Sequence, residues 1–291
     1  MTLAALHNTA HVLGNKTGRP APVDRVLVFL TVLAHSLSVD QSGDRQGGIS
    51  VHAIAESFER PFETTRRHVG ALLDGQWCIR TRSGISVAPD LLDGPVGGIA
   101  RHIHDLLVWL AEQFQTAGLP LPATRAAEPG PPHTATLAAL ELVLAAIDFS
   151  ASGYRTMREF YIVNAIMSGS VRDVTFTPTL SRQFAAISTV PGDRHRAGIN
   201  VTRLARTLGL PTVTTYRYVN HGLAIGRLER HRGGVRATQD FLASPRVRAD
   251  IRTAFLRAER AFHRLALTGF PFDAPTTRYL EGAPVLPDWG S

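Results

Sequence analysis

Apolar residues recur at helical spacing in two widely separated parts of the chain. These positions are Val26, Phe29, Leu30 and Leu33 in one part, and Phe160, Ile162, Val163 and Ile166 in the other. Steps of three and four residues place such side chains on one face of a helix. Each stretch is therefore predicted to be a helix whose apolar face is buried.

After each of these helices the pattern predicts the same order of elements: a short helix, a tight turn, a second helix and a strand–turn–strand. The predicted bounds are 51–57, about 62–74 and 77–87 in one part, and 201–208, about 212–223 and 228–235 in the other. A proline, Pro61 or Pro211, ends the turn between the helices, where its missing N–H costs nothing. Glycine interrupts each strand pair, as a hairpin turn requires. This is the order of a helix-turn-helix followed by a β-hairpin.

The two parts are also similar residue by residue. Gly48–Val87, the first block, aligns without a gap on Gly198–Ala237, the second block, at an offset of 150 positions. Thirteen of the forty aligned positions are identical, whereas average residue usage gives roughly two or three by chance. The identities include Gly48, Ala55, Pro61, Thr64, Thr65, Arg67, Val69, Leu73, Arg82 and Gly84, each paired with the residue 150 positions later. An internal duplication is therefore predicted.

The flanking helices set the predicted domain bounds. The duplicated units cover 22–122 and 155–273, and 123–154 between them is a Pro- and Ala-rich linker followed by an apolar helix. The expected fold class is mainly α with short β-hairpins, an α+β architecture with two units in tandem. The second unit has a longer spacer, about 174–197, for which the sequence suggests no role. The first twenty residues and the tail after Pro271 are predicted to be loop-like.

Two sets of buried positions follow from these patterns. The apolar helix at Leu137–Ile147 is either ordinary core or packs between the two units or between the chains of a homodimer. Within the helix pairs, the residues expected to face inward are Ile54, Ala55, Phe58, Thr65, Val69 and Leu73, with Leu204, Ala205, Leu208, Thr215, Val219 and Leu223 as counterparts.

The segment PFETTRRHVGALLDGQWCIR, residues 61–80, resembles the recognition helix and wing of bacterial winged helix-turn-helix transcription regulators, such as the MarR-like and IclR-like families. The resemblance covers about forty residues in each block and identifies no subfamily. It implies that the second helix of each pair enters the major groove of double-stranded DNA and that the hairpin contacts the adjacent backbone or minor groove.

Carried over to this chain, the resemblance implies a set of outward residues on each second helix. They are Glu63, Thr64, Arg66, Arg67 and Gly70 in the first block, and Val213, Thr214, Tyr216, Arg217 and Asn220 in the second. Arg67 and Arg217 are the foremost candidates, because a guanidinium can contact guanine or phosphate. The hairpin arginines Arg80, Arg82, Arg230 and Arg232 are expected to neutralise phosphates.

Charge changes this picture by making the two blocks unequal. The formal net charge is +7. Residues 1–133 hold eleven Lys and Arg against twelve Asp and Glu, whereas residues 134–291 hold twenty against twelve. The first helix pair is locally acidic, with Glu56, Glu59, Glu63 and Asp74. The second block is therefore expected to contribute more of the DNA binding.

Residue types argue against other classes of function. A lone cysteine, Cys78, excludes an internal disulfide and a cysteine-rich zinc site, and it is expected to be a core residue. His102 and His104 are two residues apart on a helix and point to different faces, whereas His68, His221 and His231 fall on the proposed DNA surface. No motif of hydrolases, nucleotide-binding loops or metalloproteases is present. We therefore expect no enzyme, metal or cofactor, and a cytoplasmic protein without a membrane span.

Three functions remain open on the sequence. The first is a transcription regulator in which the two units form a pseudo-dimer within one chain and address successive major-groove segments about 34–36 Å apart. The second is a plasmid-type replication initiator, which also has two winged-helix domains and would bind several DNA repeats. The third is a winged-helix protein-interaction or chromosome-organising module, which would lack salt-dependent DNA affinity if it binds only proteins. The sequence identifies no small-molecule effector.

Overall fold

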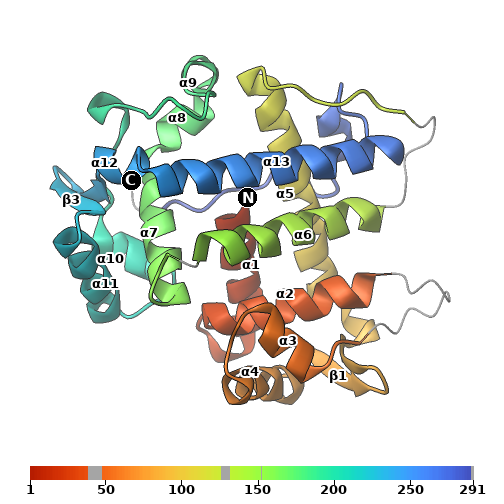
Figure 1. The fold of residues 1–291 in the computed structure, drawn as a ribbon. Helices are drawn as coiled ribbons and strands as arrows, with labels where there is room; N and C mark the ends of the chain where they lie inside the picture. The colour runs from red at the N-terminus through yellow and green to blue at the C-terminus, as the bar shows by residue number, and fades with distance from the viewer. Residues whose placement is uncertain (39–47, 126–131, 152, 290–291) are drawn as a thin grey trace. The chain divides into compact units, whose positions relative to one another are not determined.

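The computed structural model describes residues 1–38, 48–125, 132–151 and 153–289. It is mainly helical, at 64%, with two small antiparallel two-stranded sheets, as expected for this α+β class. The helices in chain order are α1 (Thr2–Gly14), α2 (Val23–Leu37), α3 (Val51–Ser57), α4 (Phe62–Asp74), α5 (Pro95–Ala117), α6 (Pro132–Ala151), α7 (Met157–Ser170), α8 (Arg172–Phe176), α9 (Pro178–Gln183), α10 (Val201–Thr207), α11 (Thr212–Ala224), α12 (Gln239–Leu242) and α13 (Pro245–Leu267). The strands are β1 (Cys78–Thr81), β2 (Gly84–Val87), β3 (Leu228–His231) and β4 (Gly234–Ala237) (Figure 1).

The chain forms two compact units. The first comprises Met1–Val108, Glu128–Asp148 and Arg278–Pro284. The second comprises Trp109–Ala127, Phe149–Thr277 and Val285–Ser291. The first block lies wholly in the first unit, and the second block lies wholly in the second.

In the first unit, α2 packs against α4 and β2, and α3 packs against α4. The Ser50 side chain caps α3 by accepting the Ala53 N–H at 3.1 Å, and the turn closes with the Arg60 N–H donating to the Ala55 carbonyl at 2.9 Å. Such caps satisfy N–H groups that a helix leaves unpaired at its start. Phe29 and Ile54 are completely buried in the core between these helices.

The second unit repeats these contacts. Helix α7 packs against α11 and β4, and α10 packs against α11. Asn200 caps α10 by accepting two backbone N–H groups at 3.0 Å, and the Leu210 N–H donates to the Ala205 carbonyl at 2.9 Å. From α3 to β2, each element of the first block has a counterpart that begins 150 positions later, from α10 to β4. Helices α5 and α13 are both 23 residues long, and they begin at Pro95 and Pro245.

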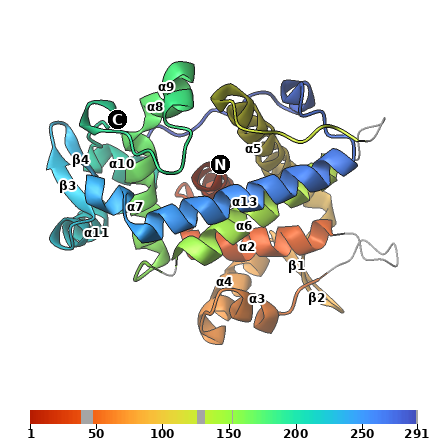
Figure 2. The same cartoon turned by 45° about the horizontal axis from the view of Figure 1, so that its top comes forward.

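The hairpins share one register as well as one length. Cys78 pairs with Val87 in β1–β2, and Leu228 pairs with Ala237 in β3–β4. Figure 2 shows both strands of each hairpin beside the helices of its own block. Each block also has an isolated β-bridge besides its hairpin. It joins Ile49 to Ile85 in the first block and Ile199 to Val235 in the second. Each hairpin is thereby tied to the residues just before α3 or α10.

Both hairpins have a glycine at the same position, and steric reasons explain why. Gly84 has φ +136°, and a Cβ there would lie 2.5 Å from the Ile49 carbonyl oxygen. Gly234 has φ +152°, and its added Cβ would clash with the Ile199 carbonyl oxygen. Only glycine fits at these two positions, because the carbonyl of the bridged isoleucine leaves no room for a Cβ and the backbone has a positive φ.

The inward face of the helix pairs differs from the prediction in detail. Leu72 is completely buried and Leu73 only half-buried, because steps of four and three residues from Thr65 through Val69 lead to position 72. At the corresponding position Gly222 lies against the Leu228 side chain, and Leu223 is half-buried. The predicted core residue Phe58 is also half-buried.

Both chain ends contradict the expectation of loops. Residues 2–14 form α1, which packs on α2 and completely buries Ala5. Its apolar spacing, with Leu6, Ala10 and Leu13, is a helical signal that the prediction missed. Beyond Pro271, the short helix at Pro275–Arg278 and the buried side chains of Phe272 and Trp289 show an ordered tail.

The apolar helix α6 is longer than the predicted Leu137–Ile147. Ala139, Leu140 and Val143 are completely buried within the chain. Residues 126–131 of the expected linker lie outside the described part. In the described ranges, no helix combines the length and the apolar character needed to cross a bilayer.

Candidate nucleic-acid interface

The second helix of the first block, α4, has one buried and one exposed face. Thr65 and Val69 point inward, whereas Glu63, Arg66 and Arg67 are exposed. Thr64 and Gly70, on the border between the faces, are half-buried. The four-residue step from Thr65 to Val69 accounts for this division, since it keeps both side chains on one stripe.

Helix α11 of the second block shows the same division. Thr215 and Val219 are buried, and the outward Arg217 and Asn220 are exposed. The side chain of Tyr216 is 43% exposed and Val213 is 82% exposed, while Thr214 is half-buried. The outward face of α11 is therefore open to solvent at the predicted contact positions, apart from the half-buried Thr214.

An ion pair reduces the free charge of α4. Arg66 donates to both carboxylate oxygens of Glu63, at 2.7 and 2.9 Å, and this hydrogen bonding lowers the pKa of Glu63. Arg67 forms no ion pair with any residue whose placement is described. Of the two predicted arginines on this helix, Arg67 is therefore the one whose guanidinium is not hydrogen-bonded to Glu63, although its charge also helps to lower the pKa of that carboxylate.

Helix α11 has no acidic residue of its own. The Arg217 guanidinium lies 5.3 Å from the centroid of the Tyr218 ring, a cation–π distance. The Tyr218 hydroxyl accepts a hydrogen bond from Thr156 at 3.2 Å. The ring that stacks on Arg217 is thus itself held in place at the start of α7.

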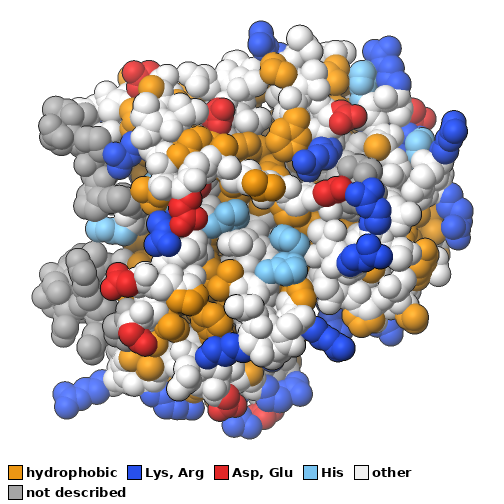
Figure 3. Space-filling model, turned by 180° about the vertical axis from the view of Figure 1, so that it is seen from behind, with side chains coloured by type: hydrophobic (Ala, Val, Ile, Leu, Met, Phe, Trp, Pro, Cys, Tyr) orange, Lys and Arg blue, Asp and Glu red, His pale blue; other side chains and the backbone are white. Residues whose placement is uncertain are grey.

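The four predicted hairpin arginines, Arg80, Arg82, Arg230 and Arg232, are all exposed. On the face drawn in Figure 3, cationic side chains reach out from the surface with a few acidic ones among them. Solvent screens the interactions of such exposed charges with other charges of the protein. Their guanidinium groups therefore remain available to phosphates.

Two further arginines of the second block are buried and serve the hairpin itself. Arg196 donates to the Ala237 carbonyl and pairs with Asp193 at 2.5 Å, although its side chain is only 1% exposed. Arg236, 7% exposed, pairs with Glu229 at 2.7 Å and with Asp193 at 3.1 Å. These arginines hold β3 and β4 to the segment before α10, so they are not free for DNA.

The histidines placed on the DNA surface make contacts within the protein. His221 lies 3.8 Å from the buried carboxylate of Glu159, which also pairs with Arg227 at 3.2 Å. His231 Nδ1 is 2.8 Å from the Arg232 carbonyl oxygen. His68 is half-buried, and burial lowers its pKa.

Helix α10 carries exposed arginines that the sequence argument missed. Arg203 and Arg206 stand where α3 has Ala53 and Glu56. Arg203 pairs at 2.5 Å with Asp288, whose carbonyl also accepts the Thr207 hydroxyl at 3.0 Å. The tail therefore covers part of α10. The only sequence signal for these arginines was their place in the first helix of the repeated pair.

The remaining candidate groups for other chemistry are placed as follows by the structure. No group of three or more metal-ligating side chains occurs among the positions described. Burial raises the pKa of the Cys78 thiol to about 12, which removes the thiolate needed for redox chemistry. The buried pair of His104 and Asp105, 3.0 Å apart, is structural, because Asp105 accepts the backbone N–H groups of Leu280 and Glu281.

Comparison with protein-family models, with curated proteins and with solved structures gave no match to this chain.

Proposed function

We propose that the protein is a sequence-specific double-stranded DNA-binding protein that regulates transcription. Each block, together with the helix before it, is a winged helix-turn-helix unit, and the two units are products of an internal duplication. They act as a pseudo-dimer within one chain, in the place of the symmetric homodimer found in the families that residues 61–80 resemble.

One observation carries this proposal: an exposed arginine on the second helix is paired with an arginine-tipped hairpin, twice and in one register. Arg67 and Arg217 occupy equivalent places on α4 and α11. Both hairpins have the same four-residue strands and the same turn position. A helix fits the width of the major groove, and a guanidinium matches the acceptor pair of guanine.

The charges of the two blocks support unequal contributions. In α4, Glu63 forms an ion pair with Arg66 and adds a negative charge to the surface proposed to face DNA. In α11, valine and tyrosine stand at these two places, and no carboxylate is present along the helix. The second block therefore meets less electrostatic repulsion on approaching phosphates, so it supplies the larger share of affinity.

The proposal is tested by selecting bound fragments from random DNA and measuring affinity by fluorescence anisotropy between 50 and 200 mM salt. We expect a selected site to bind at least about a thousandfold more tightly than a scrambled one. Affinity should fall steeply with salt as phosphate contacts release counterions. Equal, salt-independent binding of both fragments would contradict the proposal and favour a protein-interaction module.

Mapping of bound sites across the genome separates a regulator from a replication initiator. A regulator occupies single sites near promoters, whereas an initiator occupies a cluster of repeats at an origin. Occupancy restricted to such a cluster would overturn the assignment to transcription while leaving DNA binding intact.

A further inference from the structure

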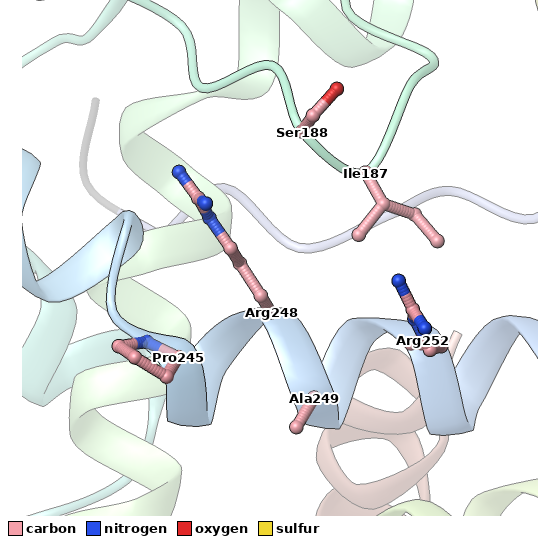
Figure 4. A pocket seen from close by; sticks show the side chains of 6 residues that line it. All are labelled: Ile187, Ser188, Pro245, Arg248, Ala249 and Arg252. Carbon is pink, nitrogen blue, oxygen red and sulfur yellow. The ribbon is translucent and has the colours of Figure 1, made fainter.

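The second unit contains a cavity of about 520 Å³, open to solvent on one side, between the start of α13 and the segment after α9. Its lining residues are Ile187, Ser188, Pro245, Arg248, Ala249 and Arg252. Figure 4 shows both guanidinium groups reaching from α13 toward the segment that carries Ile187 and Ser188, with the Ile187 side chain pointing back toward the helix. The cavity thus combines two cations with apolar walls.

The arginines of this cavity are one helical turn apart on the same face of α13. Neither Arg248 nor Arg252 forms an ion pair with a described residue. The nearest acidic side chain in the helix, Asp250, is directed to Arg246, at 3.8 Å. The two arginines thus bring two positive charges to one side of the cavity, and an anion bound there supplies the counter-charge.

The start of α13 adds positive character to the same place. The first turn of α13 contains no acidic residue, and Arg248 follows only three residues after Pro245. The positive end of the helix dipole therefore acts on the cavity together with the two side-chain charges.

The opposite wall comes from the segment that is longer in the second unit than in the first. The spacer at 174–197, for which the sequence suggested no role, forms the end of α8 and all of α9 and then continues through Ile187 and Ser188 over α13. The two connections are unequal in length: the first runs only from Leu37 to Val51, whereas the second runs from Ser170 to Val201. The wall of the cavity therefore comes from chain that the second unit has in excess of the first.

We propose that this cavity binds a small organic anion whose phosphate or carboxylate group lies between Arg248 and Arg252. Its apolar part contacts Ile187, Pro245 and Ala249. The volume lies within the usual range for small-molecule sites, about 300–1,000 Å³. The arginine fork suits either oxyanion, because both present paired oxygens to its N–H groups.

This inference is independent of the proposed function, because binding is measured without DNA. Isothermal titration calorimetry with the full chain uses phenyl phosphate and benzoate as probes, and benzyl alcohol as the uncharged control. We expect saturable binding of at least one of the two anions and none of the alcohol. Inorganic phosphate should bind more weakly than phenyl phosphate, since it lacks the apolar part.

Three variants locate the site. Arg248→Ala and Arg252→Ala should each weaken anion binding about tenfold, the loss expected for a charged hydrogen bond. Ala249→Glu, at an exposed helix position, places a carboxylate between the arginines and should abolish binding without disturbing the fold. Arg260→Ala is the matched control, because it removes an exposed arginine of the same helix outside the cavity.

Two outcomes would overturn the inference. Absence of saturable binding of either anion, or an equal loss in Arg260→Ala, would show that the cavity is no specific site. If the anions fail to bind while the Arg248→Ala/Arg252→Ala double variant loses DNA affinity, the arginines bind backbone phosphate of DNA. That result would remove the small-molecule site while supporting the proposed function.

Discussion

At the scale of single residues, arginines of the second unit divide into two groups by burial. Arg196 is 1% exposed and held by Asp193 and the Ala237 carbonyl, whereas Arg217 is exposed and lies over an aromatic ring. A buried guanidinium needs partners for its charge and its N–H groups, since an uncompensated one is strongly destabilising. Exposed arginines have no such requirement, so they are available to a ligand.

We predict that Arg217→Ala weakens binding to the selected DNA site more than Arg67→Ala. Loss of a base-contacting arginine should cost about 1–3 kcal/mol and relax sequence preference. Loss of a hairpin arginine, as in Arg230→Ala, should instead weaken all sequences alike and reduce the salt slope by about one unit. Anisotropy titrations compare the variants, and equal effects at Arg67 and Arg217 would show that the charge asymmetry does not matter.

Cys78 should resist alkylation in the folded protein. Its pKa of about 12 leaves almost no thiolate at pH 8, whereas an unperturbed thiol with a pKa near 8.5 is partly ionised. Mass spectrometry after iodoacetamide treatment should find the native chain unmodified and the urea-unfolded chain fully modified. Rapid modification of the native chain would show that the thiol is reached without unfolding.

At the scale of elements, two blocks that share thirteen of forty residues form the same helices and hairpin. The shared residues include buried ones such as Ala55 and Ala205, the turn glycines Gly84 and Gly234, and three exposed arginine pairs that begin with Arg67 and Arg217. Many other outward positions differ without altering the fold, because packing constrains buried side chains and unusual backbone angles more strongly than exposed ones.

Gly234→Ala should destabilise the second unit by about 1–3 kcal/mol, since it forces a side chain into a sparsely allowed backbone region and against Ile199. Gly226→Ala is the control, because Gly226 also has a positive φ, +71°, but nothing lies within 4 Å of an added Cβ. Urea titration measures both free energies of unfolding. A smaller loss for Gly234→Ala than for Gly226→Ala would contradict the steric explanation.

Acidification should destabilise the first unit between about pH 6.5 and 4. Burial, then the neighbouring charges of His11 and His102, lowers the pKa of His7 from 6.5 to about 4. In this window the unfolded chain binds more protons than the folded chain, so stability is complete above the unfolded pKa and falls as pH decreases. One histidine contributes at most about 1.4 kcal/mol per pH unit.

Thermal unfolding of wild type and His7→Gln across this range tests the effect. The variant should show a shallower loss of Tm on acidification, whatever its stability at pH 7. An unchanged slope would mean that His7 does not titrate as its surroundings indicate.

At the scale of the whole molecule, the differences between α4 and α11 should appear in the DNA site. Glu63 stands opposite Val213, Arg66 opposite Tyr216 and Gly70 opposite Asn220 in the alignment. A homodimer presents identical helices to both half-sites, whereas under the proposed function this chain would present two different ones.

We therefore predict an imperfect inverted repeat as the selected site. Asn220 favours adenine, Glu63 accepts from cytosine, and the equivalent Arg67 and Arg217 keep one base in common. Selection from random DNA, together with the mass of the complex, measures this. A perfect short palindrome bound by a single chain would refute the prediction.

Local sequence patterns were enough to predict the repeated elements, because apolar periodicity, caps and turn residues act over a few positions of the chain. Helix α4 has its predicted bounds, and α11 ends one residue later than predicted. The missed helix α1 followed the same local rule, with apolar residues at steps of three and four.

Tertiary structure alone decided which side chains remain available for binding. Arg203 meets Asp288, Arg196 meets the Ala237 carbonyl, and Arg248 faces the segment of Ile187 across a cavity. Each of these contacts joins residues at least 41 positions apart. No local sequence pattern predicts such a contact, because it depends on how distant segments of the folded unit are brought together.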